Sequence, residues 1–157
     1  MIRNIEITDF KQIEEIIQKT QVCHLAMIDE NIPYVVPMNF GYKDNFIYLH
    51  SGQGGRKIDI LKNKNNQVCI SMEIGSELYV RHEQVACSYS MNFESVIING
   101  NVQFIEDLDG KKDALSIIMS HYTQKKDFSF GIPALKEVVV LKIQIEKIQA
   151  RKRGVIK

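Results

Sequence analysis

The stretch Phe46-Ile-Tyr-Leu-His50-Ser-Gly-Gln-Gly-Gly-Arg-Lys57 joins a strand, a glycine-rich turn and the start of a helix. Its first four residues favour a strand, and that strand is expected to end at His50. A serine hydroxyl and three glycines follow, and Arg56 and Lys57 stand where the helix is expected to begin. Backbone N–H groups, a hydroxyl and two fixed positive charges together bind phosphate groups. The stretch therefore predicts a site for a phosphorylated small molecule.

Other interpretations of this turn are more ordinary or fit less well. A glycine-rich turn with solvated cations is common and has no necessary ligand. A P-loop needs Ser or Thr after its lysine, but Ile58 follows Lys57. A dinucleotide fingerprint needs G-x-G-x-x-G at the start of a long helix, which residues 52–57 do not supply.

The composition indicates a single globular domain over residues 1–157. Hydrophobic residues make up 45% of the chain and charged residues 25%, with a net charge of +1. This charge argues against nucleic acid as the main partner, because nucleic-acid-binding proteins usually concentrate basic charge on one face. No apolar run approaches the roughly 20 residues that cross a membrane, and the first residues do not resemble a secretion signal. We therefore expect a cytoplasmic protein with no membrane partner.

The cysteines indicate the same compartment. Cys23, Cys69 and Cys87 each lie in an apolar, strand-like run, so we expect buried, reduced thiols. There is no C-x-x-C pair, and the spacing from His82 to Cys87 fits no zinc pattern, so no metal site is predicted.

Hydrophobic periodicity predicts a mainly β protein. Asp9 is expected to cap a first helix, residues 57–62 form a second, and Asp109 is expected to cap a third. Residues 75–83 are expected to form a loop. The expected strands are 22–28, 33–42, 46–50, 67–74, 85–90, 93–105 and 138–145. Tight polar turns between successive strands indicate an antiparallel meander, and the sum is a closed barrel with peripheral helices.

Several segments, in order, resemble one known family. Pro33 to Tyr42, Tyr48 to Ser51, Gly55 to Lys57 and Ala86 to Ile97 resemble the FMN-binding split barrels related to pyridoxamine 5′-phosphate oxidase. Their order and spacing are most similar to the nitroimidazole-resistance (Nim) branch, over about residues 5 to 150. The resemblance implies a six-stranded antiparallel split barrel that forms a homodimer and holds one FMN in each of two interface clefts.

The resemblance also places a cofactor site on particular residues. Met38 and Asn39 would lie along the isoalloxazine edge, and His50 would stand beside the ring. The full set of implied cofactor-binding residues is Met38, Asn39, His50, Ser51, Gly55, Arg56, Lys57 and, from the neighbouring subunit, Ser95.

Two residues depart from the pattern of that branch. Glu94 stands before Ser95 where a basic residue is usual, and Tyr89 stands where a tryptophan is common. Tyr89 could stack on a ligand, but core packing is the favoured interpretation. The half of the site that comes from the neighbouring subunit is therefore the part least fixed by the resemblance.

The implied activity is FMN-dependent reduction of a nitro-aromatic, nitroimidazole-like or other small electrophile. His50 is the candidate proton donor, because imidazole titrates near neutral pH, although it could instead only hydrogen-bond the flavin or backbone. The other histidines are expected to be a partly buried strand residue, His24, and two surface residues, His82 and His121. Two other functions remain open: a flavin-binding redox or stress protein without catalysis, and a haem-binding split barrel. Pyridoxamine phosphate oxidation itself is disfavoured, because residues 150–157 lack the Arg-x-His segment of those oxidases.

Overall fold

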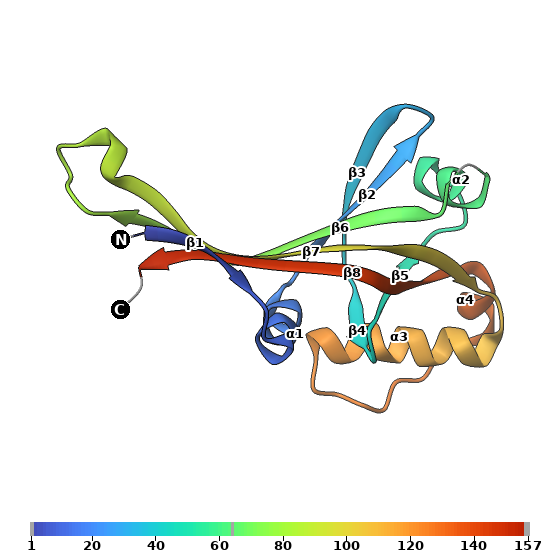
Figure 1. Cartoon of the computed structure of the whole chain (residues 1–157). Coiled ribbons are helices and arrows are strands. Elements are labelled where there is room, and N and C mark those ends of the chain that lie inside the picture. The colour runs from blue at the N-terminus through green and yellow to red at the C-terminus, as the bar shows by residue number, and fades with distance from the viewer. Residues whose placement is uncertain (1, 64, 156–157) are drawn as a thin grey trace.

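The computed structural model describes residues 2–63 and 65–155, which form one antiparallel sheet with helices at its periphery (Figure 1). Within these residues the strands follow the order β3-β2-β6-β7-β8-β5-β4, and β1 pairs with β8. The strands are β1 (Ile2–Ile7), β2 (Cys23–Asp29), β3 (Ile32–Met38), β4 (Gly41–Lys43), β5 (Phe46–Ser51), β6 (Gln67–Val80), β7 (Tyr89–Ile105) and β8 (Val139–Val155). The helices are α1 (Phe10–Lys19), α2 (Arg56–Asn63), η1 (Ala86–Ser88), α3 (Leu108–Tyr122) and α4 (Ile132–Glu137).

The sheet curls around one apolar core, which confirms the predicted split barrel. Alternate residues of the strands point inward, as the period of two requires. The side chains of Leu25, Ile47, Ile70, Ile98 and Ile143 are fully buried, at 0% exposure. Each such side chain contributes about 1.5–3 kcal/mol on burial. The expectation of a closed barrel is wrong, because the edge strands β3 and β4 do not pair within the described residues, and the sheet has eight strands rather than the expected six.

The end of β6 and the beginning of β7, which pair from Glu77 with Asn92 to Val80 with Tyr89, extend away from the barrel as an arm (Figure 1). The predicted loop at 75–83 is wrong for residues 75–80, because β6 continues to Val80, and it is confirmed only for residues 81–83. A register shift between Ile74 and Glu77, with Gly75 at a φ of 67°, lets the strand continue past the irregularity. Residues 86–88 form the 3₁₀ turn η1 at the tip of this arm, where a strand over 85–90 was expected.

The last strand is also longer than predicted. β8 runs from Val139 to Val155, and its second half pairs with β7 on one side and β1 on the other. That half is rich in charge, so its sequence does not resemble a buried strand. Pairing on both sides satisfies its backbone groups and keeps it extended.

The expected strand over residues 33–42 is divided in two. The backbone N–H of Phe40 donates to the hydroxyl of Tyr122 at 3.0 Å instead of to a neighbouring strand. The Phe40 ring is fully buried, at 0% exposure. The chain therefore bends between β3 and β4 to place this ring in the interior.

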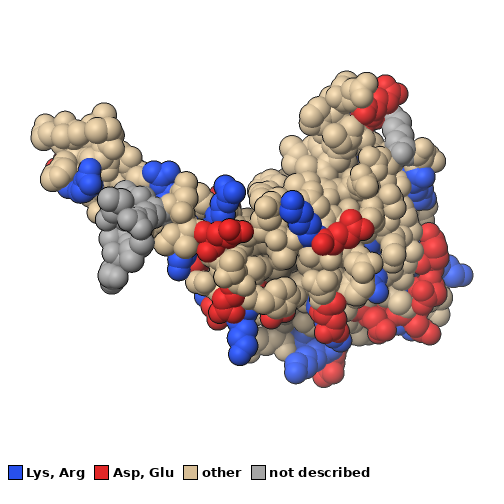
Figure 2. Space-filling model, viewed as in Figure 1, with Lys and Arg blue, Asp and Glu red and all other residues tan. Residues whose placement is uncertain are grey.

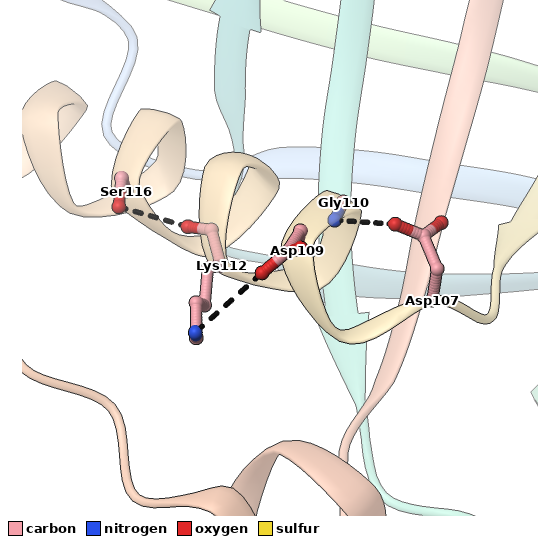
Figure 3. A network of polar contacts seen from close by, with 5 residues as sticks. All are labelled: Asp107, Asp109, Gly110, Lys112 and Ser116. Atoms are coloured by element: carbon pink, nitrogen blue, oxygen red, sulfur yellow. Dashed lines mark hydrogen bonds and ion pairs between the residues drawn. The ribbon is translucent and has the colours of Figure 1, made fainter.

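Helix α3 begins two residues earlier in the chain than a cap at Asp109 predicts. Asp107 is the N-cap residue, and its Oδ2 accepts a hydrogen bond from the backbone N–H of Gly110 at 2.7 Å (Figure 3). Asp109 lies inside the first turn and pairs with Lys112 at 3.6 Å. The cap predicted for α1 is confirmed, since Asp9 accepts from the backbone N–H of Lys11 at 3.1 Å.

Helix α4 was not predicted, and a buried lysine holds it in place. Lys111 of α3 is only 7% exposed, and its ammonium donates to the carbonyls of Leu135 at 3.1 Å and Val138 at 2.8 Å. These carbonyls lie at the end of α4, where a positive charge is favourable. Lys111 therefore joins α3 to the segment that leads into β8.

The cysteines differ from one another. Cys23 is buried, and burial raises the pKa of its thiol to about 12. Cys69 is half-buried, but Cys87 at the tip of the arm is exposed, so the expectation of three buried thiols is wrong.

Among the described residues, no helix has the length and apolar character needed to span a bilayer.

Candidate functional site

The glycine-rich turn and the start of α2 bring five of the expected site residues together. β5 ends at Ser51, and α2 begins at Arg56. Gly55 has a φ of 101°, a left-handed conformation that favours glycine, and its carbonyl accepts the helical hydrogen bond from Asp59 at 3.1 Å. The turn therefore carries the chain directly from the end of a barrel strand into a helix N-terminus, as predicted.

Lys57 supplies a positive charge without a partner. Its side chain is half-buried, and it makes no hydrogen bond or ion pair with any residue in the ranges 2–63 and 65–155. Burial lowers the pKa of this lysine below its ordinary value of 10.5. A partly desolvated ammonium ion next to a helix N-terminus favours binding of an anion.

His50 lies close enough to Lys57 for the charge of Lys57 to affect the pKa of His50. Desolvation by neighbouring groups, and secondarily the positive charge of Lys57, lowers the pKa of His50 below 6.5. The imidazole is therefore mainly neutral at pH 7 in the single chain. His50 remains exposed, so a ligand bound at the turn can reach it.

Arg56 has partners that the sequence did not indicate. Its Nε donates to Oδ2 of Asp29 at 2.8 Å, and its guanidinium carbon lies 4.4 Å from the centre of the Tyr34 ring. Both partners belong to the β2–β3 hairpin. No local signal links Asp29 to Arg56, because 27 positions separate them and only the folded sheet brings them together.

Met38 and Asn39 lie at the end of β3. The side chain of Met38 is 8% exposed and belongs to the apolar core, so any contact it makes with a ligand at the surface is limited to its backbone. Asn39 is exposed between β3 and β4. The two residues thus face different surroundings, although they are adjacent in the sequence.

Ser95 lies far from the turn of its own chain. Ser95 on β7 pairs with Arg151 on β8. His50 on β5 pairs with Val140 on β8, and Val140 pairs on its other side with Ile105 on β7. Ile105 is ten positions along β7 from Ser95, which corresponds to about 33 Å of extended strand. Ser95 and His50 therefore cannot contact one ligand within one chain unless that ligand is very long.

Glu94 and Tyr89, the two residues that depart from the pattern of the Nim branch, both lie on β7. Glu94 is half-buried and stands opposite Lys152 of β8. Tyr89 is 45% exposed, and its hydroxyl donates to the carbonyl of Glu83 at 3.0 Å. The expectation that Tyr89 packs in the core is wrong for the single chain.

The other histidines are partly as expected. His82 is exposed, as predicted, but His24 is exposed rather than partly buried. His121 is half-buried instead of lying on the surface. Its Nε2 lies 2.7 Å from the carbonyl oxygen of Thr20, and its ring is 4.4 Å from that of Phe40. His121 therefore has a packing role.

A separate groove of about 790 Å³ lies between α1, β4, β5 and α3, and no residue expected in the site lines it. Burial, followed by the hydrogen bond to Glu14 at 2.8 Å, raises the pKa of Tyr42 in this groove to about 12. Burial and the negative charges of Asp44 and Asp113 raise the pKa of Tyr48. Asp44 and Asp113 place negative charge in this groove, whereas Arg56 and Lys57 place positive charge at the turn of residues 52–57. The described residues include no group of three His, Cys, Asp or Glu side chains that could hold a metal ion.

The fold and the turn define a class, namely split-barrel proteins with a glycine-rich turn that leads from a barrel strand into a helix that begins with two cationic residues. A family model described as pyridoxamine 5′-phosphate oxidase matches residues 9–152. The chain belongs to this family, which confirms the resemblance found in the sequence. A comparison with curated proteins gives no match.

Solved structures support the same assignment. A protein of Bacteroides thetaiotaomicron VPI-5482, provisionally described as a 5-nitroimidazole antibiotic resistance protein, is 42% identical, with a TM-score of 0.86 over 98% of this chain and 90% of the other. The flavocytochrome Anf3 of Azotobacter vinelandii is 18% identical, with a TM-score of 0.82 over 96% of this chain and 70% of the other. An FAD- and haem-binding protein of Mycobacterium smegmatis is 14% identical, with a TM-score of 0.84 over 96% and 74%. The last two similarities demonstrate a shared fold only.

Proposed function

We propose that this protein is a homodimeric FMN-binding flavoprotein that reduces nitro-aromatic, nitroimidazole-like or other small electrophiles. The observation that carries the proposal is Lys57, a half-buried ammonium ion at a helix start with no partner among the described residues. The 42% identical protein of Bacteroides thetaiotaomicron, described in terms of nitroimidazole resistance, supports the choice of substrate class.

The phosphate of FMN would bind at the turn. Lys57 and the outer N–H groups of Arg56 supply charge-assisted hydrogen bonds, and Ser51 supplies a hydroxyl. Gly55 leaves open space above the backbone, because no atom lies within 4 Å of the position a Cβ would take. A phosphate dianion there would compensate the charge of Lys57, as an anion at a helix N-terminus does.

The isoalloxazine ring would extend from the turn towards His50 and the backbone of Met38 and Asn39. When bound, FMN supplies the electrons for reduction of the substrate. His50 would supply a proton to the substrate. Its pKa is lowered partly by Lys57, so a phosphate that offsets the charge of Lys57 would raise the pKa of His50 again towards neutral pH.

A second copy of the chain would complete the site. Ser95 is too far from the turn of its own chain, so it would serve the cleft of the neighbouring subunit. The arm and the neighbouring end of β8 also carry buried polar atoms without a partner in the described residues, namely Ser90 Oγ and Asn92 Oδ1 on β7 and Arg153 Nε on β8. Such atoms normally have hydrogen-bond partners, which a second chain can supply.

The surface of the single chain supports this assembly. Leu78 on the arm is 60% exposed, and Val35 on the β2–β3 hairpin is 58% exposed. Figure 2 shows a hollow between the arm and this hairpin, and the side chains of the hairpin are almost all uncharged. Exposed apolar side chains at this density favour contact with another protein surface.

The cofactor is tested by the absorption spectrum of the purified protein and by titration with FMN. Flavin gives two broad visible bands, whereas haem gives a Soret band. Lys57→Met should weaken FMN binding roughly ten- to a hundredfold, because a hydrogen bond to a charged group is worth about 1.5–3 kcal/mol. Lys62→Met, on the exposed side of the same helix, is the matched control. A protein that stays colourless with excess FMN, or that shows only a Soret band, contradicts the proposal.

The activity is tested by anaerobic mixing of the reduced, FMN-loaded protein with a nitroimidazole. Reoxidation should be faster than that of free FMN, and His50→Ala should slow it without loss of the flavin. Reoxidation no faster than that of free FMN would leave a flavin-binding protein without this activity. Loss of the flavin in His50→Ala would make His50 a binding residue rather than a proton donor.

A further inference from the structure

Arg56 is held on two sides by the β2–β3 hairpin, whereas Lys57 is not held at all. Asp29, the last residue of β2, accepts from Nε of Arg56 at 2.8 Å. Tyr34 of β3 lies under the guanidinium, at 4.4 Å from ring centre to guanidinium carbon. The side chain of Asp29 is 19% exposed and that of Arg56 is 47% exposed, so the pair is only partly screened by water.

These contacts determine which donors of Arg56 remain available. A guanidinium is planar and carries five N–H groups in a fixed arrangement. Once Nε is bonded to Asp29 and one face rests on Tyr34, the plane is fixed. The terminal Nη groups, which make no hydrogen bond to any described residue, are then the donors left for a ligand at the turn.

An arginine held in this way loses less conformational freedom when it binds a phosphate than a free arginine does. Asp29 also carries a negative charge, which by itself would repel the phosphate. Because Asp29 already shares a 2.8 Å contact with Arg56, its charge is largely offset by the pair, and orientation of the guanidinium is its main effect.

We propose that Asp29 and Tyr34 are positioning residues that orient Arg56 towards a phosphate ester, so that the β2–β3 hairpin sets the discrimination between phosphorylated and unphosphorylated flavin. This inference rests on the proposed function. It assigns a role to two residues outside the glycine-rich turn, and it gives the hairpin a part in ligand selection.

The test compares the dissociation constants of FMN and riboflavin, which differ only in the phosphate, by flavin fluorescence. Asp29→Asn and Tyr34→Leu should each weaken FMN binding about 3- to 10-fold and leave riboflavin binding unchanged. Tyr34→Phe keeps the ring and should bind both flavins as the wild type does. Asp29→Glu keeps the carboxylate and should recover part of the FMN affinity.

A double-mutant cycle separates positioning from a general effect on the fold. If Asp29 acts through Arg56, adding Asp29→Asn to Arg56→Met should not weaken FMN binding further. Thermal unfolding of each variant checks that the fold is intact. If Asp29→Asn does not fold, the comparison of Tyr34→Leu with Tyr34→Phe tests whether the hairpin positions Arg56.

Several results would overturn the inference while the proposed function stands. Tighter FMN binding by Asp29→Asn would show that the main effect of Asp29 is to repel the phosphate. Equal losses for FMN and riboflavin, or additive losses in the double variant, would make the contact structural only. A wild type that binds neither flavin would overturn the proposed function, and this inference with it.

Discussion

The backbone of Gly41 in β4 lies directly against the backbone of Ile118 in α3. A Cβ added to Gly41 would stand 2.7 Å from the amide nitrogen of Ile118, closer than real Cβ contacts occur. The absence of a side chain at Gly41 is therefore what allows α3 to pack on β4 and β5. Since β5 leads to His50, this contact supports the element that carries the candidate site.

Gly41→Ala should destabilise the protein by about 1–3 kcal/mol, because helix and strand must move apart to admit the methyl group. Urea unfolding followed by circular dichroism measures the change. Gly54→Ala is the control, since no atom lies within 4 Å of its added Cβ. Equal stability of the two variants would show that the contact at Gly41 relaxes at no cost.

Asp107→Ala should reduce the free energy of unfolding by about 0.5–2 kcal/mol, because the amide of Gly110 loses its capping acceptor. Asp109→Ala should have a smaller effect, since Asp109 is 93% exposed and its pair with Lys112 is an exposed ion pair. Thermal unfolding of both variants distinguishes the two positions. A larger loss for Asp109→Ala would restore the cap that the sequence predicted.

Lys111→Met should reduce the free energy of unfolding by about 1–3 kcal/mol, because the carbonyls of Leu135 and Val138 lose a buried donor. Lys112→Met removes a neighbouring charge without a buried partner and is the matched control. We expect hydrogen exchange to increase selectively in residues 132–139 of Lys111→Met. Unchanged exchange there would mean that α4 is held by other contacts.

His50 should titrate below its ordinary pKa of 6.5 in the flavin-free protein, because desolvation and then Lys57 disfavour its charged form. The folded state therefore binds this proton less readily than the unfolded state. The stabilising contribution of neutral His50 is complete above pH 6.5, and it is lost as the pH falls through the lowered pKa. Lys57→Met should raise the pKa of His50 only part of the way, because desolvation is the larger cause. Histidine ring NMR measures both values, and an unchanged pKa in Lys57→Met would contradict the proximity of the two groups.

Local sequence was enough for the elements that depend on neighbouring residues. Asp9 with the apolar spacing of α1, and the run from Phe46 to His50, form the elements that they predict. The turn at 52–57 also follows from local chemistry, because glycines and cations act through their own backbone and charge. The resemblance to known split barrels then supplied the topology.

What the sequence could not reveal depends on residues far apart. The pairing of Asp29 with Arg56 needs the β2–β3 hairpin to lie beside α2, and nothing near either residue indicates this. The charged second half of β8 becomes a strand only because β1 and β7 flank it. Asp107 and Asp109 are equally good caps by residue type, and only the position of the chain at the end of β7 decides between them.

The pairing of β1 with the far half of β8 has a practical consequence for engineering. Ile2 stands opposite Val155 in the register, so the two ends of the described chain lie side by side (Figure 1). A short linker between them would make a circular permutant, with new ends opened at the tight turn of Asp44 and Asn45 between β4 and β5. Such a rearranged chain would keep every strand of the sheet while moving any fused tag from the arm to the opposite side of the barrel.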